Sequence, residues 1–524
     1  MKKNYALKSI FISFAGLLIF AFTSCQSSNV SVSRSGAGIS EKIKVDIKNV
    51  SPINDGVFEG WGTSLCWWGN RLGGNEKLSN EAVDLFFTMD KGIGLNIIRY
   101  NIGGGDDPSH NHIGRSDSAM PGFWKNVDES GNFEYDWTAD GRQRNVLKKI
   151  AAKVDDNLIV EFFSNSPPYF MTKSGCTSGN KPGFADNIIE DKYEDFAEYL
   201  AEVTYNLQKI DGIKVASLEP MNEPRSVSWS AFSGKQEGCH VSKGKNQSKL
   251  LILTRQALDK RGLQNIIVTG SDEYGSGNQS SSITAWSKDA RNSLGRINTH
   301  TYWGENYKKI LSLSAKYEKN LWISETDGFS SIGKNNGQMG PALDFAKKIL
   351  KDMSARPSAW LIWQSVASYI SAEPFNGIVD GVWTPDFSKG FWGVVVADFV
   401  NEKILLSKKY YAFGQFTKYI RPGSYVIYID SENYIASYNP KLNQVSIVCV
   451  NSTVNEKNCT FDLSSFVNGW NKVMAIRTSG MDLEDGENMG QVDMEIENSG
   501  DGMFSASLIP NSITTFVIDG VKKY

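Results

Sequence analysis

The chain has 524 residues, of which 40% are hydrophobic and 22% charged, and its formal net charge at pH 7 is −3. This length predicts several domains, or one large barrel with an appendage, and the apolar content excludes a wholly disordered chain. The slight excess of acidic residues argues against a nucleic-acid-binding protein, because binding to phosphates needs a surplus of Lys and Arg.

Residues 1–24 have the composition of a secretory signal. Three lysines precede the apolar run of residues 10–22, which is shorter than the roughly 20 residues of a membrane-spanning helix. Cys25 follows two small residues, and this pattern resembles the lipobox of bacterial lipoproteins; an ordinary signal peptide with a chance cysteine is the alternative. We expect an exported protein, acylated at Cys25 and held at the outer membrane, on its periplasmic or cell-surface face, only through this lipid anchor. Residues 25–40, rich in Ser and Gly, are expected to be a flexible tether.

Residues 57–409 alternate between short apolar or β-branched runs and amphipathic helical patterns. The runs are Val57–Thr63, Leu95–Tyr100, Asn157–Phe163, Val215–Glu219, Asn265–Gly270, Arg296–Tyr302, Asn320–Glu325 and Ala359–Gln364. Alternating strands and helices predict a parallel sheet, and eight strands favour a closed (β/α)₈ TIM barrel over a doubly wound open sheet. Ser79 as an N-cap and Gly92 after the last turn predict one of the helices over residues 81–91.

From residue 410 to 524 the pattern changes to short strands separated by Gly, Asn, Asp and Pro. The expected strands are Tyr425–Ile429, Tyr434–Tyr438, Gln444–Val450, Lys472–Arg477, Val492–Ile496, Met503–Leu508 and Ile513–Ile518. This pattern predicts an all-β sandwich. Residues 41–56 begin with a similar alternation and are expected to add a strand to it.

Export makes disulfide bonds possible for the remaining five cysteines, although their spacing alone does not fix the pairing. Cys176 and Cys239 lie in two loops rich in Gly, Ser and Lys and are the favoured pair. Cys449 and Cys459 could bridge neighbouring strands. Cys66, in an apolar stretch, is expected to be a buried thiol.

Two glutamates follow strands of the predicted barrel, where catalytic groups of this fold lie. Glu223 belongs to the segment Asn222-Glu223-Pro224 after the fourth strand, and Glu325 ends the seventh strand. Carboxylates on separate strands can face each other across the barrel mouth. Glycoside cleavage needs this arrangement, because one carboxylic acid protonates the leaving oxygen while a carboxylate opposite attacks the anomeric carbon or activates water. Glu219, within the fourth strand, is expected to be structural.

Several motifs resemble glycoside hydrolase family 30, one of the families of retaining barrel glycosidases grouped as clan A. They are Phe58-Glu59-Gly60-Trp61-Gly62-Thr63-Ser64, Asn96-Ile97-Ile98-Arg99-Tyr100, Ser164-Asn165-Ser166-Pro167-Pro168-Tyr169-Phe170-Met171, Glu219-Pro220-Met221-Asn222-Glu223-Pro224 and residues 410–423. The resemblance covers roughly residues 45–520. It implies a TIM barrel with an attached β-sandwich, no cofactor, and net retention, with Glu223 as acid/base and Glu325 as nucleophile about 5–5.5 Å apart.

The resemblance also implies roles for neighbouring residues. Arg99 and Tyr302, at the ends of the second and sixth strands, are expected to donate hydrogen bonds to Glu325, and a purely structural ion pair is the alternative for Arg99. Asn222 is expected to bind the 2-hydroxyl of the attacked sugar. Asn165 and Asp106, in loops after the third and second strands, are further candidates for substrate binding; for Asp106 an ordinary Gly/Asp-rich surface loop is the alternative.

The aromatic content, with 14 Trp, 20 Tyr and 27 Phe, points to sugar stacking in addition to core packing. Six aromatic residues are expected at the same rim as the two glutamates. They are Trp67, Trp68, Tyr169, Phe170, Trp303 and Trp363. For any one of them, core packing is the alternative.

Within the family, residues 62–68, 174–176 and 236–240 look most like the endo-β-1,6-galactanase branch, which acts on arabinogalactan side chains. The predicted function is therefore a retaining endo-glycosidase acting on β-1,6-galactan, with a polysaccharide or oligosaccharide as its partner and a monomer as its expected form. Alternatives are a β-1,6-glucanase, a xylanase, an exo-acting β-glycosidase, or a non-catalytic glycan-binding lipoprotein. The presence of both glutamates favours an enzyme, because binding alone needs neither.

A metal site is not expected. His110 and His112 share a polar loop, but the sequence shows no third ligand close to them, and only four histidines are present.

Overall fold

The computed structural model describes residues 30–523 apart from 36–37, 116, 328–336, 368–390, 468–469, 471, 485 and 499–500. The predicted signal, the predicted acylation site Cys25 and the first part of the predicted tether therefore lie outside the described residues. In the part that is described, no helix has both the length and the apolar character needed to cross a membrane. Part of the predicted tether is ordered: β1 (Val30–Ser35) pairs antiparallel with β2 (Gly38–Lys44), so the prediction of a flexible segment up to residue 40 is wrong there.

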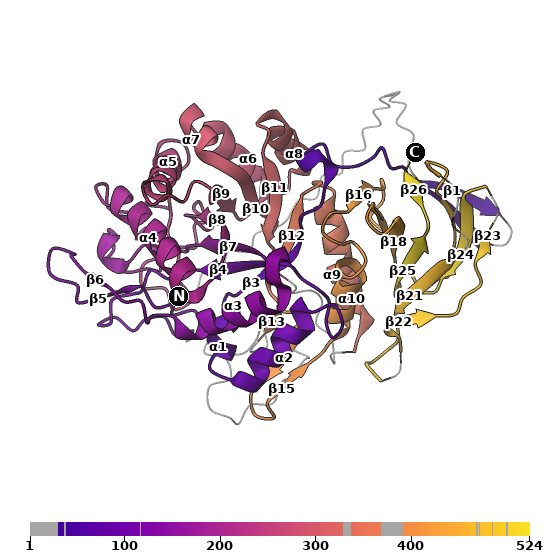
Figure 1. Cartoon of the computed structure of the whole chain (residues 1–524), viewed down its shortest axis with the longest axis horizontal. Coiled ribbons are helices and arrows are strands. Elements are labelled where there is room, and N and C mark those ends of the chain that lie inside the picture. Colours follow the sequence, from indigo (N-terminus) through magenta and orange to yellow (C-terminus); the bar gives the residue numbers. More distant parts are fainter. Residues whose placement is uncertain are drawn as a thin grey trace, which may run out of the picture.

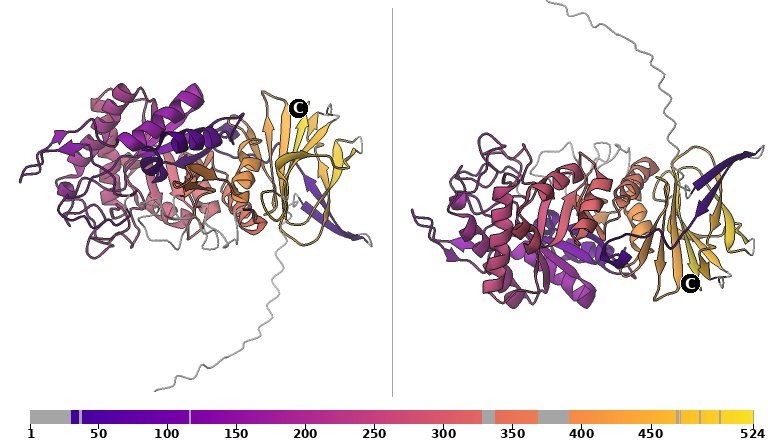
Figure 2. Two further views of the ribbon diagram at one scale, coloured as in Figure 1. Left: turned by 90° about the horizontal axis from the view of Figure 1, so that it is seen from below. Right: turned by 90° about the horizontal axis from the view of Figure 1, so that it is seen from above.

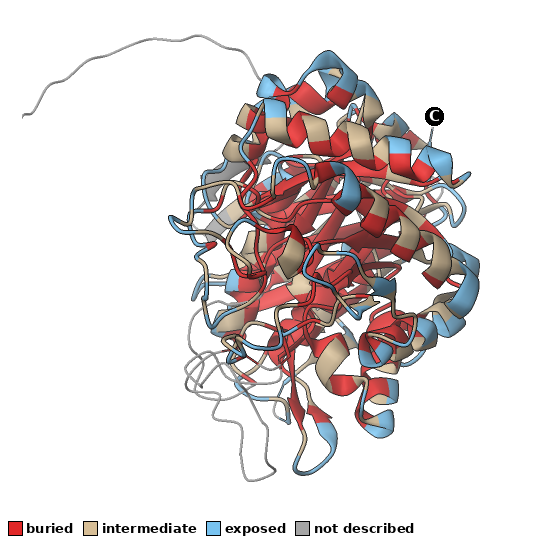
Figure 3. Ribbon diagram, turned by 90° about the vertical axis from the view of Figure 1, so that its left-hand side faces the viewer, coloured by how far each residue is buried: buried red, intermediate tan, exposed pale blue. Residues whose placement is uncertain are grey.

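Eight parallel strands close into a barrel, which confirms the predicted (β/α)₈ fold (Figure 1). In chain order they are β3 (Gly60–Ser64), β4 (Ile97–Asn101), β7 (Ile159–Phe163), β8 (Val215–Glu219), β9 (Ile267–Glu273), β10 (Leu294–His300), β11 (Asn320–Glu325) and β12 (Ala359–Gln364). The last strand returns to the first, with Trp360 beside Trp61. The strands are buried on both faces, as Figure 3 shows, and this explains why their sequences are nearly continuous apolar runs.

Helices surround the barrel and present their apolar stripes to it. They are α1 (Trp68–Leu72), α2 (Glu76–Phe87), α3 (Gly141–Val154), α4 (Tyr193–Asp211), α5 (Lys245–Lys260), α6 (Ser276–Ala285), α7 (Lys288–Ser293), α8 (Tyr307–Lys316), α9 (Met339–Met353) and α10 (Lys408–Thr417), with 3₁₀ turns η1 (Asn54–Gly56), η2 (Asp155–Asn157) and η3 (Tyr169–Met171). The predicted ends of α2 are wrong. Its N-cap is Asn75, whose side chain accepts a hydrogen bond from the Leu78 amide at 3.0 Å, and the helix gives way to extended backbone at Thr88.

The C-terminal region is a sandwich of two sheets, with orders β1-β2-β19-β24-β23 and β16-β17-β18-β25-β21-β22. Its strands are β16 (Tyr425–Tyr428), β17 (Tyr434–Asn439), β18 (Gln444–Asn451), β19 (Lys457–Asp462), β21 (Val473–Thr478), β22 (Asn488–Val492), β23 (Glu497–Asn498), β24 (Met503–Leu508) and β25 (Ser512–Asp519). The N-terminal strand β2 pairs in parallel with β19 and so lies in the sandwich (Figure 2). The sequence missed β19, and it placed one strand at residues 492–496, where the structure has β22 ending at Val492.

Smaller sheets complete the fold. They are β5 (Trp124–Lys125) with β6 (Glu134–Tyr135), β13 (Val366–Ala367) with β14 (Val395–Asp398) and β15 (Lys403–Leu405), and β20 (Phe466–Val467) with β26 (Lys522–Lys523). The predicted boundary at residue 410 falls inside α10, which packs against α9 and belongs to the barrel. Phe413 of α10 lies edge-on to Trp61 of β3 at 6.2 Å. The sandwich proper therefore starts at β16.

Candidate active site

The two predicted glutamates meet at the carboxyl ends of the barrel strands. Glu223 follows β8 and Glu325 ends β11, and one carboxylate oxygen of each lies within 4.8 Å of the other. The side chains are 15% and 9% exposed, so a ligand in the barrel mouth can reach both. This separation suits a retaining pair, since an inverting pair needs a gap of about 6.5–9.5 Å for water.

The backbone of Glu223 adopts an unusual conformation, with φ at +46°. A positive φ is uncommon for a residue with a β-carbon and persists only where the surroundings hold it. The Glu223 amide donates to the Asp272 carbonyl at 2.8 Å, and the Trp229 indole donates to the Glu223 carbonyl, also at 2.8 Å. These contacts fix the turn that aims the carboxyl group into the barrel mouth.

Arg99 and Tyr302 contact Glu325 as the sequence predicts. Arg99 Nη1 donates to Oε2 of Glu325 at 3.2 Å, and the Tyr302 hydroxyl donates to Oε1 at 3.0 Å. Burial raises the pKa of Glu325, whereas the positive charges of His300 and Arg99 oppose that rise. The donors therefore favour the ionised form that a nucleophile needs.

His300, at the end of β10, is a site residue that the sequence analysis missed. Its Nδ1 lies 3.1 Å from Oε1 of Glu223 and 3.6 Å from Oε1 of Glu325. Burial alone would lower the pKa of His300, but the charges of Glu325 and Asp272 and the hydrogen bond to Glu223 outweigh it and raise the pKa to about 10. The imidazolium joins the two carboxyl groups. The sequence feature that could have identified it is its position at a strand end, two residues before Tyr302.

A buried charge network lies beneath the site. Arg99 is fully buried and forms ion pairs with Glu161 at 3.0 Å and with Asp272. Glu161 also pairs with Arg296. Glu219 is fully buried in β8, and burial together with the charges of Asp272 and Glu161 raises its pKa well above the usual range, so it is a neutral group within the strand.

The rim aromatics divide into exposed and buried residues. Trp68 is fully buried, and its indole donates to the Ser64 carbonyl at 2.8 Å, so its predicted role in sugar binding is wrong and core packing accounts for it. Trp67 is 2% exposed and packs edge-on to the partly exposed Trp363 at 5.7 Å. Trp303 is 72% exposed and lies beside Tyr302 at 6.1 Å, which makes it the most accessible of these rings near Glu325.

The remaining predicted substrate-binding residues lie at the same end of the barrel. Asn165 Nδ2 and Asn222 Oδ1 are buried and have no hydrogen-bond partner among the described residues. Such atoms are rare in folded proteins and suit contacts with sugar hydroxyls. Tyr169 is partly exposed and packs against Trp124 at 5.4 Å. Asp106 instead accepts from the Thr177 amide and lies 3.0 Å from His112, so its carboxylate already has protein contacts.

The predicted disulfide bond between Cys176 and Cys239 is not formed in the structure, where all five described cysteines are free and buried. The two thiols contact different backbone groups: Cys176 Sγ accepts from the Phe232 amide at 3.3 Å, and the Cys239 thiol donates to the His240 carbonyl at 3.7 Å. Cys449 and Cys459 are likewise free in the sandwich core. Cys66 is a buried thiol, as expected.

Two groups of described residues could place three ligand atoms around a metal ion, with the atoms of each group within 4.8 Å of one another. Glu223, His300 and Glu325 form the first, where a protonated His300 has no lone pair to offer a metal. Asp106, His110 and His112 form the second. The expectation that the two loop histidines lack a third ligand is therefore wrong, because the chain folds Asp106 against them.

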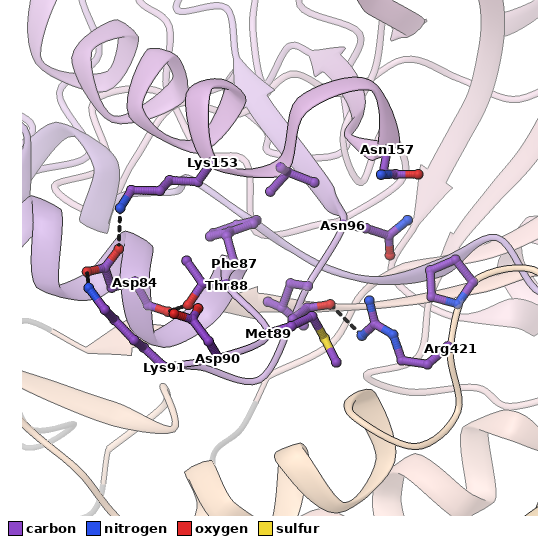
Figure 4. Close-up of a pocket in the computed structure, with 14 residues that line it drawn as sticks. Asp84, Phe87, Thr88, Met89, Asp90, Lys91, Asn96, Lys153, Asn157 and Arg421 are labelled. Atoms are coloured by element: carbon purple, nitrogen blue, oxygen red, sulfur yellow. Dashed lines mark hydrogen bonds and ion pairs between the residues drawn. The ribbon is translucent and has the colours of Figure 1, made fainter. Parts of the chain in front are cut away.

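A cavity of about 610 Å³ lies at the opposite end of the barrel (Figure 4), beside Asn96 and Asn157, which precede β4 and β7. Its charges are paired: Lys91 and Lys153 contact Asp84 at 3.1 and 2.8 Å, and Arg421 donates to the Gly94 carbonyl at 2.7 Å. The two glutamates lie at the other end of the strands, so this cavity is separate from the active site.

Replacing His300 with glutamine is expected to lower the free energy of unfolding by a few kcal/mol in a pH-dependent way. The pKa of His300 rises from 6.5 to about 10 on folding, so its contribution is fully present below pH 6.5 and is lost as the pH rises towards 10. Urea unfolding of both proteins across this range measures the difference. A difference that does not change with pH would contradict the assignment of a protonated His300.

Comparison with known proteins agrees with this geometry. The sequence matches the model of "O-Glycosyl hydrolase family 30" over residues 42–298. An endo-beta-1,6-galactanase of Hypocrea rufa is 30% identical over 492 residues, covering 89% of this chain and 93% of the relative. An exo-beta-1,6-galactobiohydrolase of Bifidobacterium longum subsp. longum is 23% identical, covering 78% of this chain and 34% of the relative.

Among solved structures, the catalytic domain of GH30 xylanase C from Talaromyces cellulolyticus has a TM-score of 0.66 at 18% identity. The match covers 91% of this chain and 99% of that one. At this level of identity the likeness concerns the fold alone.

Proposed function

The chain belongs to glycoside hydrolase family 30, and from this premise we propose that it is a retaining endo-glycosidase that hydrolyses β-1,6-galactan, the side-chain polymer of arabinogalactan. The observation that carries the proposed chemistry is the pair of carboxyl groups within 4.8 Å, with His300 between them. A site that only bound glycans would need neither group.

In the first step Glu325 attacks the anomeric carbon while Glu223 gives its proton to the glycosidic oxygen, so that the bond to the leaving sugar breaks and a glycosyl ester forms on Glu325. His300 Nδ1 donates a hydrogen bond to Oε1 of Glu223 at 3.1 Å. The proton that Glu223 gives to the glycosidic oxygen is therefore carried by its other oxygen, Oε2. In the second step Glu223 takes a proton from water as that water attacks the anomeric carbon and releases Glu325. Two displacements retain the configuration.

The choice of β-1,6-galactan is supported by the relative that is 30% identical over most of this chain and is an endo-beta-1,6-galactanase. The exposed Trp303 beside Tyr302 and the partly exposed Trp363 can supply stacking surfaces for sugar rings on either side of the glutamates. A protein with several such surfaces can hold a chain of sugars, as endo action requires.

The product profile on β-1,6-galactan, β-1,6-glucan and xylan tests the proposal. We expect short galacto-oligosaccharides from the first polymer and little release from the other two. Galactose or a single disaccharide as the sole early product would establish exo action instead. Preferred cleavage of glucan or xylan would replace the galactan assignment, and no turnover on any polymer would favour a glycan-binding protein.

We further propose that the protein is a monomer that is exported and anchored through an acylated Cys25. The signal-like composition of residues 1–24 and the small residues before Cys25 support this proposal. Replacing Cys25 with serine should move the protein from the membrane fraction to the soluble fraction of the cell envelope.

A further inference from the structure

Asp106, His110 and His112 come together in the loop after β4. One ligand atom of each lies within 4.8 Å of the others, and all three side chains are partly exposed. Nδ1 of His110 and Nδ1 of His112 are buried and have no hydrogen bond within the described structure. Each of the two histidines therefore has a ring nitrogen without a hydrogen-bond partner, and both rings lie beside the carboxylate of Asp106.

The hydrogen bonds of Ser178 identify which nitrogen of His112 carries the proton. The single hydroxyl proton of Ser178 goes to the Ser230 carbonyl at 3.0 Å, while its oxygen accepts from the Ser233 amide at 3.1 Å. His112 Nε2, 3.1 Å from the same oxygen, must therefore be a donor. In the neutral ring this leaves a lone pair on Nδ1.

A carboxylate oxygen lies close to this nitrogen. Oδ2 of Asp106 lies 3.0 Å from His112 Nδ1, yet the contact does not have hydrogen-bond geometry. In the neutral ring two electron-rich atoms at this distance repel each other, and a cation bound to both would remove that repulsion. A Zn²⁺ ion with bonds of about 2.0–2.2 Å holds neighbouring ligand atoms about 3.3 Å apart, so the observed spacing is close to that of a metal site.

The surroundings hold the three ligands in place. The Thr177 amide donates to the second oxygen of Asp106 at 2.9 Å, and the buried Glu237 accepts from the amides of Gly104 and Gly105 just before it. Phe232 packs against the rings of His110 and His112, with centroids 4.9 and 5.4 Å away. Such outer contacts orient ligands and tune the affinity of metal sites.

We propose that Asp106, His110 and His112 bind one divalent transition-metal ion of the Zn²⁺ class. Two imidazoles and one carboxylate are a donor set that zinc accepts, with water completing the coordination. The ion would hold together three side chains of the loop after β4, and Ser178 and Phe232, from the loops after β7 and β8, contact these ligands. The site does not include Glu223 or Glu325. It lies beside a cavity of about 440 Å³ that Asp106, His112 and Trp124 line. The role that we assign to the ion is to stabilise the loops around this cavity.

Calorimetric titration of the EDTA-treated protein with ZnCl₂ tests the site. We expect one ion per chain and a higher Tm in its presence, because a ligand that binds the folded state alone stabilises that state. His112→Gln, His110→Gln and Asp106→Asn should each weaken binding by at least about tenfold. Asp106→Asn keeps an acceptor for the Thr177 amide, which makes it the mildest structural change.

His240→Gln is the matched control. His240 also pairs with an aspartate, Asp186 at 2.8 Å, but belongs to neither three-ligand group among the described residues. Its loss should leave zinc affinity unchanged. Absorption by Co²⁺ bound to the unmodified protein gives a second readout that needs no variant. Absence of saturable binding of both ions, or equal affinity in all four variants, would overturn the proposal and leave a simple Asp–His contact.

Discussion

Glu325→Ala is expected to abolish hydrolysis while the protein still folds. Glu325 is the group placed to attack the anomeric carbon, and loss of a nucleophile lowers kcat by about 10⁴-fold or more. Folding should survive because Arg99 keeps its ion pairs with Glu161 and Asp272. Reducing-sugar release measures the activity and circular dichroism the fold. Turnover like that of the unmodified protein would refute the assignment of the nucleophile.

Glu223→Ala is the matched control for that experiment, because the two residues have different roles at the same site. Added azide can replace a missing nucleophile or act in place of water once the acid/base is gone. On an activated aryl glycoside, azide should give a glycosyl azide of inverted configuration with Glu325→Ala and of retained configuration with Glu223→Ala. The opposite pattern would exchange the roles of the two glutamates.

Arg99→Met is expected to lower the free energy of unfolding by about 3–5 kcal/mol, the range for removing one partner from a buried ion-pair network. Arg99 is fully buried, and its guanidinium contacts Glu161, Asp272 and Glu325. Without it, carboxylates remain in the barrel with less compensating charge. Urea denaturation at constant pH measures the change.

Lys192→Met is the control for loss of a surface ion pair. Lys192 contacts Asp195 at 2.8 Å, with side chains 30% and 49% exposed, and its loss should change stability by less than about 1 kcal/mol.

The activity per folded molecule of Arg99→Met decides whether Arg99 supports Glu325 or only forms a structural ion pair. We expect it to fall, because Arg99 Nη1 donates to Glu325. Unchanged specific activity would mean a structural ion pair only.

Strand-end position was enough to predict several site residues. A parallel barrel brings the carboxyl ends of its strands together, so Glu223, Glu325, Arg99 and Tyr302 could be assigned to one rim without coordinates. His300 occupies the same kind of position, but it was not among the residues assigned to the site from the sequence. Its function depends on three carboxyl groups that reach it from β8, β9 and β11, and that convergence is not visible in the order of residues.

The incorrect predictions about individual side chains share a cause: each concerned how a side chain packs once the chain is folded. Trp67 and Trp68 were both expected at the rim, yet both rings are buried, Trp68 in the main core and Trp67 in a smaller buried cluster. Cys176 and Cys239 lie in similar loops, but their thiols contact different backbone groups. Asp106 reaches His110 and His112 only because the loop folds back on itself.

The sequence by itself determined the barrel, the sandwich and the position of Glu223 and Glu325 at one rim, because hydrophobic periodicity and strand ends are local properties of the chain. Only the tertiary structure decided the charge of His300, the burial of Trp68, the free cysteines and the cluster of Asp106, His110 and His112. Most of these features depend on distances between side chains that are far apart along the chain, and such distances are set by the packing of whole elements against one another. The cluster lies within one loop, whose histidines are held by contacts with Ser178 and Phe232 of other loops.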